Sequence, residues 1–266
     1  MKSQILGMAG DLDQARAVAE RYLHESAPEY PSDHCKQHES AGNLAAENGD
    51  FRKAIEHYSE MQKHARRDTD NPRDLIQSLY LQGLAFLRLG EFKASFDSLA
   101  KGEELARQHP VEDLLDRIFF TRAELQIVSG EPEKALETIE RIDLDGRELP
   151  DLFRIGALDL LTIALSSVER WDEALKRCRE AKECLGSHQN LNLRAQLDYR
   201  LASIQLEMQL YSDVVDSVDS SLSTLREPNA VILMQLLKCE SLLELGRTDE
   251  ASQTYQACIE VADSSD

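Results

Sequence analysis

The sequence predicts an all-α fold: a right-handed superhelical solenoid of about six full helix hairpins plus an N-terminal partial one. Three observations support this prediction. Small side chains return about every 40 residues, turn residues lie midway between them, and all 7 prolines fall outside the expected helix interiors. We expect a single array over 1–266, with approximate units 1–33, 35–72, 73–111, 112–149, 150–189, 190–228 and 229–266.

Each expected hairpin carries two small residues, one on each helix. Where two helices cross closely, a large side chain would force the axes beyond the usual separation of roughly 8–10 Å. On the second helices the small or medium residues are Ala15, Ala54, Ser95, Ala135, Ala174, Val214 and Ala251, separated by 37 to 41 residues. On the first helices they are Gly42, Gly83, Ala123, Thr162, Ala202 and Cys239. These positions predict the crossing points of the hairpins.

A turn residue follows seven positions after each small residue of the first helices. Glycine supplies the left-handed helix stop at four of these positions, and Glu169 and Gln209 take the other two. Polar residues next to the turn are typical helix N-caps, and the candidates are Asp50, Ser212 and Thr248. Pro132 suits the first turn of a helix, where its missing N–H is not needed.

The repeated pattern, as in the stretch from Gly49 through Phe51 and Ala54 to Tyr58, resembles the tetratricopeptide repeat (TPR) over nearly the whole chain. The usual TPR period is 34 residues, whereas about six extra residues lie between hairpins here. The pattern is therefore similar to the longer TPR-like arrays of regulatory proteins. The resemblance implies a helical array that binds other proteins or peptides.

Composition restricts the partners. The 30 Lys and Arg face 49 Asp and Glu, which gives a net charge of −19 and repels nucleic acid and anionic lipid. We expect no direct nucleic-acid binding and no membrane insertion. The 5 cysteines form no Cys-x-x-Cys pair, and the chain start lacks a signal-peptide apolar run, so we expect a cytoplasmic protein.

The inward side of the first helices is the candidate partner-binding groove. Aromatic residues recur there at one register position, at Tyr80, Phe120 and Tyr199, and charged residues surround them. The full set is Asn43, Tyr80, Leu84, Leu87, Arg88, Arg117, Phe120, Glu124, Ile127, Asp159, Ile163, Tyr199, Ser203 and Leu206. Apolar anchors with flanking charges suit a bound peptide or helix. In the alternative interpretation the same residues pack against neighbouring helices.

The sequence lacks the motifs of enzymes. It holds no Gly-x-Ser-x-Gly, phosphate-binding loop, His-Glu-x-x-His or dinucleotide fingerprint, so we expect neither catalysis nor a cofactor. His34 and His38 share a helix face, which suits a metal, but we interpret them as surface residues at a helix start and expect no metal. Cys178, Cys239 and Cys258 lie at packing positions, where cysteine acts as a small core residue.

The sequence thus favours a protein-interaction module or scaffold that holds a peptide or helix in its groove. The alternative is a regulatory array that senses an effector, as in bacterial signalling or transcription control. Terminal repeats usually carry a polar outer face, yet the last helix ends soon after Tyr255 and Ile259. We therefore also expect a homo-oligomer or a larger assembly through the terminal repeats.

Overall fold

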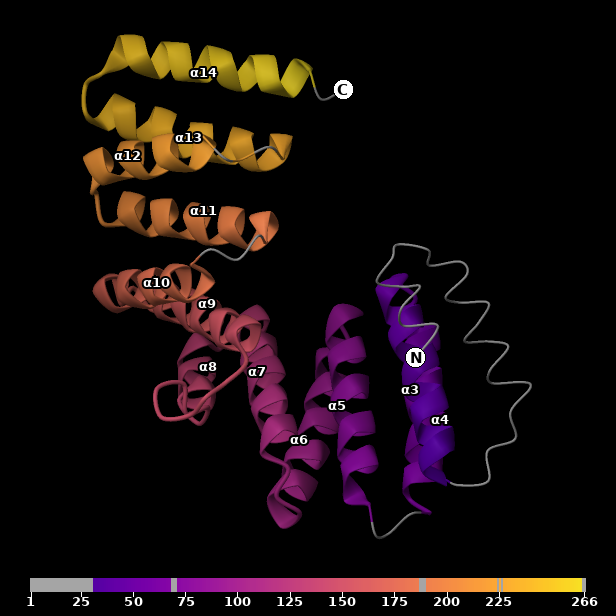
Figure 1. Ribbon diagram of the computed structural model, residues 1–266. Coiled ribbons are helices and arrows are strands. Elements are labelled where there is room, and N and C mark those ends of the chain that lie inside the picture. Colours follow the sequence, from indigo (N-terminus) through magenta and orange to yellow (C-terminus); the bar gives the residue numbers. More distant parts are fainter. Residues whose placement is uncertain (1–30, 68–70, 187–189, 224, 226, 265–266) are drawn as a thin grey trace. The chain divides into compact units, whose positions relative to one another are not determined.

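The computed structural model describes residues 31–67, 71–186, 190–223, 225 and 227–264. Within these residues the chain forms twelve α-helices and no strand (Figure 1). The prediction of an all-α helical repeat fold is confirmed. The expected N-terminal partial hairpin, with Ala15, lies outside the described residues.

The chain divides into two compact units, Met1–Glu131 and Pro132–Asp266, which are described separately. Unit 1 contains helices α3 (Pro31–Glu47), α4 (Phe51–Ala65), α5 (Pro72–Arg88), α6 (Phe92–Gln108) and α7 (Glu112–Val128). Unit 2 contains α8 (Pro132–Ile139), α9 (Asp151–Ser167), α10 (Trp171–Leu185), α11 (Leu191–Glu207), α12 (Tyr211–Leu222), α13 (Pro228–Glu244) and α14 (Thr248–Asp263).

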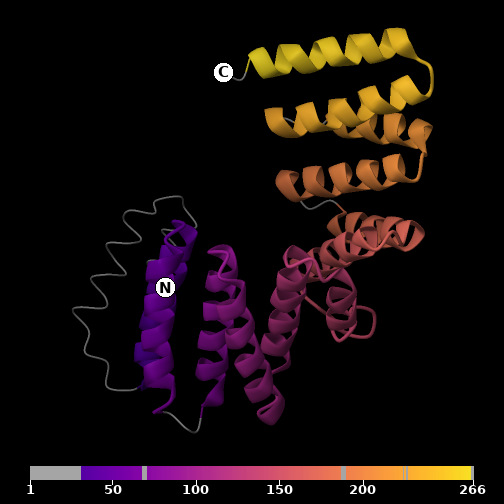
Figure 2. The same cartoon turned by 180° about the vertical axis from the view of Figure 1, so that it is seen from behind.

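Within each unit the helices pair into antiparallel hairpins that stack in sequence order. Helix α3 packs on α4 and α5 on α6 in unit 1, and α9 packs on α10, α11 on α12 and α13 on α14 in unit 2. Each hairpin then contacts the first helix of the next, as α4 contacts α5 and α12 contacts α13. The hairpins of unit 2, coloured orange to yellow, follow one another as layers (Figures 1 and 2).

The small residues lie where the hairpin helices cross. Ala54, Ala174 and Val214 are fully buried. A Cβ atom added at Gly83 would stand 2.7 Å from Leu99, and one added at Gly42 would stand 2.4 Å from Tyr58. These separations are too short for a side chain, so glycine is required for the observed helix approach.

The turns follow the predicted pattern with one correction. Gly49, Gly90, Gly130 and Gly246 have positive φ angles, as do Glu169 and Gln209. The next residue is the N-cap, and at Asp50 the carboxylate accepts a hydrogen bond from the backbone N–H of Lys53 at 3.1 Å. Ser212 and Thr248 are not caps, because α12 begins at Tyr211, after Leu210, and α14 begins at Thr248, after Arg247.

Four prolines of the described residues are the first residue of a helix. Helices α3, α5, α8 and α13 begin with Pro31, Pro72, Pro132 and Pro228. At this position the missing backbone N–H removes no helical hydrogen bond. The expectation that proline would not interrupt a helix is confirmed for the described residues.

Candidate partner-binding faces on the first helices

The predicted groove residues all lie on first helices of hairpins, but they belong to two units. Unit 1 holds Asn43, Tyr80, Leu84, Leu87, Arg88, Arg117, Phe120, Glu124 and Ile127, on α3, α5 and α7. Unit 2 holds Asp159, Ile163, Tyr199, Ser203 and Leu206, on α9 and α11. The structure therefore gives two candidate faces.

In unit 1 side chains bridge consecutive first helices. Gln77 donates to the Glu39 carboxylate at 3.2 Å across α3 and α5. Arg88 pairs with Glu124 at 2.7 Å across α5 and α7. Tyr80 packs between two apolar clusters, and burial raises the pKa of its hydroxyl group. This face is a polar network with half-buried aromatic rings.

Two predicted groove residues of unit 1 serve packing instead. Leu87 is only 6% exposed and belongs to the core cluster with Leu99 and Ile118. The Asn43 side-chain oxygen accepts a hydrogen bond from the Tyr58 hydroxyl at 2.8 Å, which joins α3 to α4. At these positions the structure favours the packing interpretation. Leu84, Phe120 and Ile127 are half-buried, and Arg117 is exposed.

In unit 2 Asp159 is buried as well. It is 6% exposed, and its carboxylate accepts hydrogen bonds from Arg200 and, at 2.8 Å, from Gln196. The charge of Asp159 is therefore balanced within the chain, and the contact joins α9 to α11. Sequence reasoning missed Arg200, although it lies 41 residues after Asp159, about one repeat later.

Tyr199 is the predicted aromatic residue that reaches the surface. Its side chain is 38% exposed, and its backbone carbonyl accepts a hydrogen bond from Ser203 Oγ at 2.9 Å. Ile163 and Leu206 are half-buried. Leu236 of α13, which is 43% exposed, occupies the equivalent position 37 residues after Tyr199. Extending the repeat register by one unit would have found it.

The histidines of α3 are not simple surface residues. His34 and His38 are half-buried and meet histidines of α4. The His34 and His64 rings stack with centroids 4.3 Å apart, and His38 Nδ1 lies 3.4 Å from His57 Nδ1. Burial, together with the neighbouring histidines, lowers the pKa of His38 to about 4. In the described residues no group of three or more ligand side chains is arranged to hold a metal ion.

Two cysteines of the packing positions are buried. Cys178 is fully buried, and the loss of solvation raises the pKa of its thiol to about 12, which disfavours the nucleophilic thiolate. Cys258 is buried as well, whereas Cys239 is half-buried. Among the described helices none is long and apolar enough to cross a membrane.

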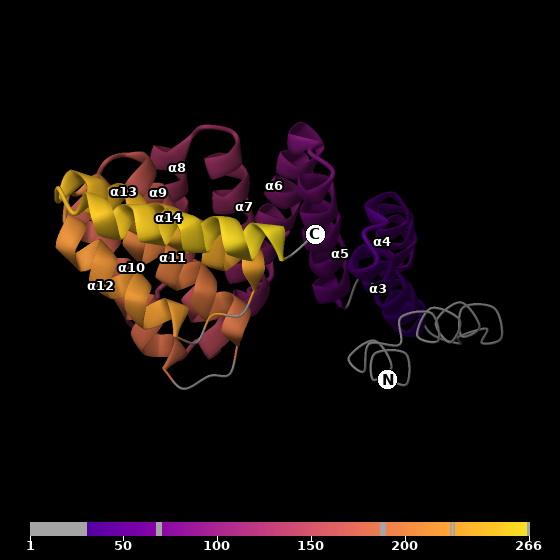
Figure 3. The same ribbon diagram turned by 90° about the horizontal axis from the view of Figure 1, so that it is seen from above.

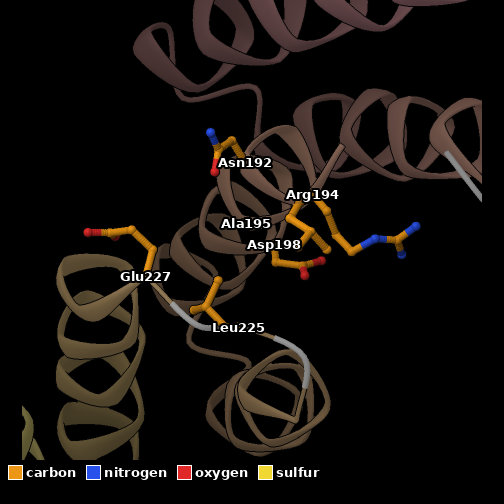
Figure 4. Close-up of a pocket in the computed structure, with 7 residues that line it drawn as sticks. Asn192, Arg194, Ala195, Asp198, Leu225 and Glu227 are labelled. Carbon is orange, nitrogen blue, oxygen red and sulfur yellow. The ribbon is translucent and has the colours of Figure 1, made fainter. Parts of the chain in front are cut away.

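A hollow of about 300 Å³ lies at the start of α11 (Figure 4). Its wall combines Arg194, Asp198 and Glu227 with the amide of Asn192 and with apolar side chains of Leu191 and Leu225. Asp198 also forms an ion pair of 2.5 Å with Lys182 of α10. Arg194 donates a hydrogen bond to the Gly186 carbonyl, and the Glu227 carboxylate accepts hydrogen bonds from the backbone N–H groups of Asn229 and Ala230. The charged groups of this wall therefore already have partners within the chain.

Comparisons with known proteins agree with the repeat pattern. Two models of the tetratricopeptide repeat match residues 2–21 and residues 240–264. No curated protein is similar in sequence.

Several solved structures share the fold. RapI in its apo form superimposes with a TM-score of 0.63 at 12% identity, over 98% of this chain and 95% of that chain. BtubC from P. vanneervenii superimposes with a TM-score of 0.67 at 14% identity, over 80% of this chain and 91% of that chain. The quorum sensor NprR from B. thuringiensis gives 0.63 at 12% identity in its apo form, over 98% and 85%. The same protein in complex with its cognate peptide NprX superimposes with a TM-score of 0.59 at 14% identity, over 98% of this chain and 82% of that chain.

At these identities the structural similarity concerns the fold alone. The helix hairpins, the buried small residues and the sequence matches nevertheless agree with one another. The chain is an all-α helical repeat protein, and two of its segments match the tetratricopeptide repeat.

Proposed function

We propose that the chain is a non-catalytic protein-interaction module that binds a peptide segment or helix of another protein along its first helices. The observation that supports this most directly is Tyr199, an aromatic ring that is 38% exposed on a first helix of unit 2. Exposed aromatic side chains on rigid elements are the typical anchors of protein interfaces.

The surroundings of Tyr199 suit such an anchor. Ser203 follows one turn later on the same helix, and the neighbouring Arg200 is held by the buried carboxylate of Asp159. A guanidinium that is already fixed loses little side-chain entropy when it binds a partner. Unit 1 has a separate candidate face, where Arg117 is exposed near the half-buried Tyr80.

The structural comparisons support the same role. NprR, which shares the fold over most of this chain, was solved with its cognate peptide. That similarity makes a peptide or an extended protein segment the first class of ligand to test.

A displayed library of random 12-residue peptides, selected on the full chain, tests the proposal. Peptides that bind the wild-type chain should bind Tyr199→Ala at least roughly tenfold more weakly, because the variant removes an exposed anchor without opening the core. Fluorescence anisotropy with labelled peptides measures this change.

Phe92→Ala is the matched control, because Phe92 is an aromatic residue of similar exposure (41%) on the second helix α6. Its affinity for the selected peptides should equal that of the wild type. If both variants bind like wild type, the selected peptides occupy another surface, and the proposal is wrong for Tyr199.

A regulatory array that senses a small effector is the second candidate. The hollow at the start of α11 supports it, because its volume of about 300 Å³ leaves room for a small molecule between charged and apolar side chains (Figure 4). Ligands that bind only the folded chain raise its melting temperature. A thermal-shift screen with charged metabolites therefore distinguishes this role from that of a simple scaffold.

A further inference from the structure

The last hairpin of unit 2 carries an apolar groove between α13 and α14. The groove has a volume of about 470 Å³ and is lined by Leu236, Cys239, Leu243, Ala251 and Tyr255, with Glu240 at its edge. Leu243 is 55% exposed and Tyr255 is 53% exposed. We call this surface the terminal groove. The two helices that form it pack against each other (Figure 1), and in the view from above α14 passes over α13 (Figure 3).

The preceding hairpin, formed by α11 and α12, shows which element packs into a groove of this kind. Thirty-seven residues earlier, the positions of Cys239, Leu243, Ala251 and Tyr255 are held by Ala202, Leu206, Val214 and Val218. Ala202, Val214 and Val218 are completely buried, because Met234 and Leu237 of α13 pack onto them. The equivalent groove one hairpin earlier is thus filled by the first helix of the next hairpin.

The same arrangement recurs in unit 1. Leu81 and Ala85 of α5 pack on Ala54 and Tyr58 of α4. Helix α7 contributes Ile118 to the cluster around Leu99. In each case a helix enters the groove with apolar side chains spaced three, four or seven residues apart, which lie on one helix face. The terminal groove is therefore suited to bind one amphipathic helix.

The charges of the last hairpin indicate which kind of helix can bind in the terminal groove. Residues 228–263 contain six acidic and two basic side chains. Both basic residues are already paired, Lys238 with Asp219 at 2.5 Å and Arg247 with Glu250 at 2.6 Å. Within the described part of the chain, Glu240, Glu244 and Glu260 form no ion pair. A helix with an acidic polar face would meet like charges here, and a basic one would not.

We propose that the terminal groove binds one basic amphipathic helix of another protein, in the place that the first helix of a hairpin takes elsewhere in the chain. A second copy of this chain is a poor occupant, because its net charge is −19. The terminal groove includes Leu236, the register equivalent of Tyr199, but not Tyr199 itself, and the proposal does not depend on the proposed function.

The test uses the full chain and a synthetic 17-residue helical peptide. The peptide has the sequence of α13, residues 228–244, with Cys239→Ala, Glu240→Lys and Glu244→Lys, so that it keeps Met234 and Leu237 and becomes basic. A control peptide keeps both glutamates and carries Lys238→Glu, so that it is equally apolar but acidic. We expect the basic peptide to bind at least roughly tenfold more tightly than the acidic one at low salt.

Variants of the full chain locate the site. Leu243→Asp should weaken binding of the basic peptide by at least roughly tenfold, although it adds a favourable negative charge, because it removes an apolar contact in the groove. Leu152→Asp, which changes a leucine of similar exposure on α9, is the matched control and should leave binding unchanged. Tyr199→Ala should also leave it unchanged. Circular dichroism checks that each variant is folded.

Three results would overturn the proposal. Equal binding of the acidic and basic peptides would show that charge does not select the occupant. Undiminished binding to Leu243→Asp would show that the peptide lies elsewhere. A dimer in sedimentation that dissociates in Leu243→Asp would assign the groove to a second copy of the chain.

Discussion

Glu169 and Gln209 occupy turn positions that glycine fills in the other hairpins. Their φ angles are +59° and +58°, in the left-handed region that disfavours residues with a Cβ atom. The repeat imposes this conformation because the same stop is needed between the two helices of each hairpin. At the single-residue scale, these two positions therefore hold backbone strain that the glycines avoid.

Replacement of Gln209 by glycine should stabilise the chain. Relief of the left-handed strain is worth about 1–2 kcal/mol and is partly offset by the greater entropy of glycine in the unfolded chain, so we expect a net gain of about 0.5–1 kcal/mol. Urea unfolding followed by circular dichroism measures the difference in free energy of unfolding.

Gly90→Ala is the reverse control. A Cβ atom at Gly90 would meet nothing within 4 Å, so only the backbone conformation opposes it. The variant should lose about 1 kcal/mol. A destabilised Gln209→Gly variant would show that the glutamine side chain makes a stabilising contact that outweighs the strain.

At the scale of helices, the polar contacts that join two helices differ in how deeply they are buried. In the α3–α4 hairpin the half-buried His38 meets His57, with His34, His64 and Glu60 nearby. In unit 2 the buried Asp159 of α9 is held by Arg200 of α11. Burial rather than the number of contacts decides how much each contributes to stability.

The histidine contact predicts a pH-dependent stability. The pKa of His38 is about 4 in the folded chain and 6.5 in the unfolded chain, so between these values the unfolded chain binds more protons. The free energy of unfolding therefore falls as the pH falls from about 6.5 to about 4. After allowance for partial solvent screening, we expect His38 to account for about 1–2 kcal/mol of this loss.

The comparison of wild type with His38→Gln isolates this contribution from that of the carboxylates. The difference in free energy of unfolding between the two proteins should change across that window and stay constant above pH 7. A pH-independent difference would show that His38 titrates alike in both states.

The Asp159–Arg200 pair predicts a large effect of a single substitution. Arg200→Ala leaves a buried carboxylate with only Gln196 as a hydrogen-bond donor, so we expect a loss of about 2–4 kcal/mol in free energy of unfolding. Arg73→Ala is the matched control, because Arg73 pairs with Asp113 at 2.5 Å on the surface. It should cost less than about 1 kcal/mol. If urea unfolding gave equal losses in free energy of unfolding for both variants, burial would not be what makes the Asp159–Arg200 pair important.

At the scale of the whole molecule, periodicity made the fold predictable. A small residue is required wherever two helices cross, as Gly42 and Gly83 show, and this local steric demand leaves a regular trace in the sequence. The turn positions were predictable for the same reason. The caps were predicted less well, because a shift of two residues at Leu210 or of one at Arg247 changes which residue precedes the helix.

The candidate site was predictable only in part. Tyr199 and Arg117 are exposed on first helices, but Leu87 and Asp159 share their register and are buried. The residues that cover or pair with them, such as Ile118 and Arg200, lie in other hairpins, far away in the sequence. A register position alone does not tell which neighbour fills the space beside it.

The sequence by itself determined the helical class, the hairpin repeat and the acidic character, because each depends on residue type and spacing along the chain. The tertiary structure decided which side chains remain open to a partner. Exposure is the balance between a side chain and the neighbours that fold against it. The terminal groove illustrates this, since the equivalent positions around Ala202 are closed by α13 whereas those around Leu243 are open.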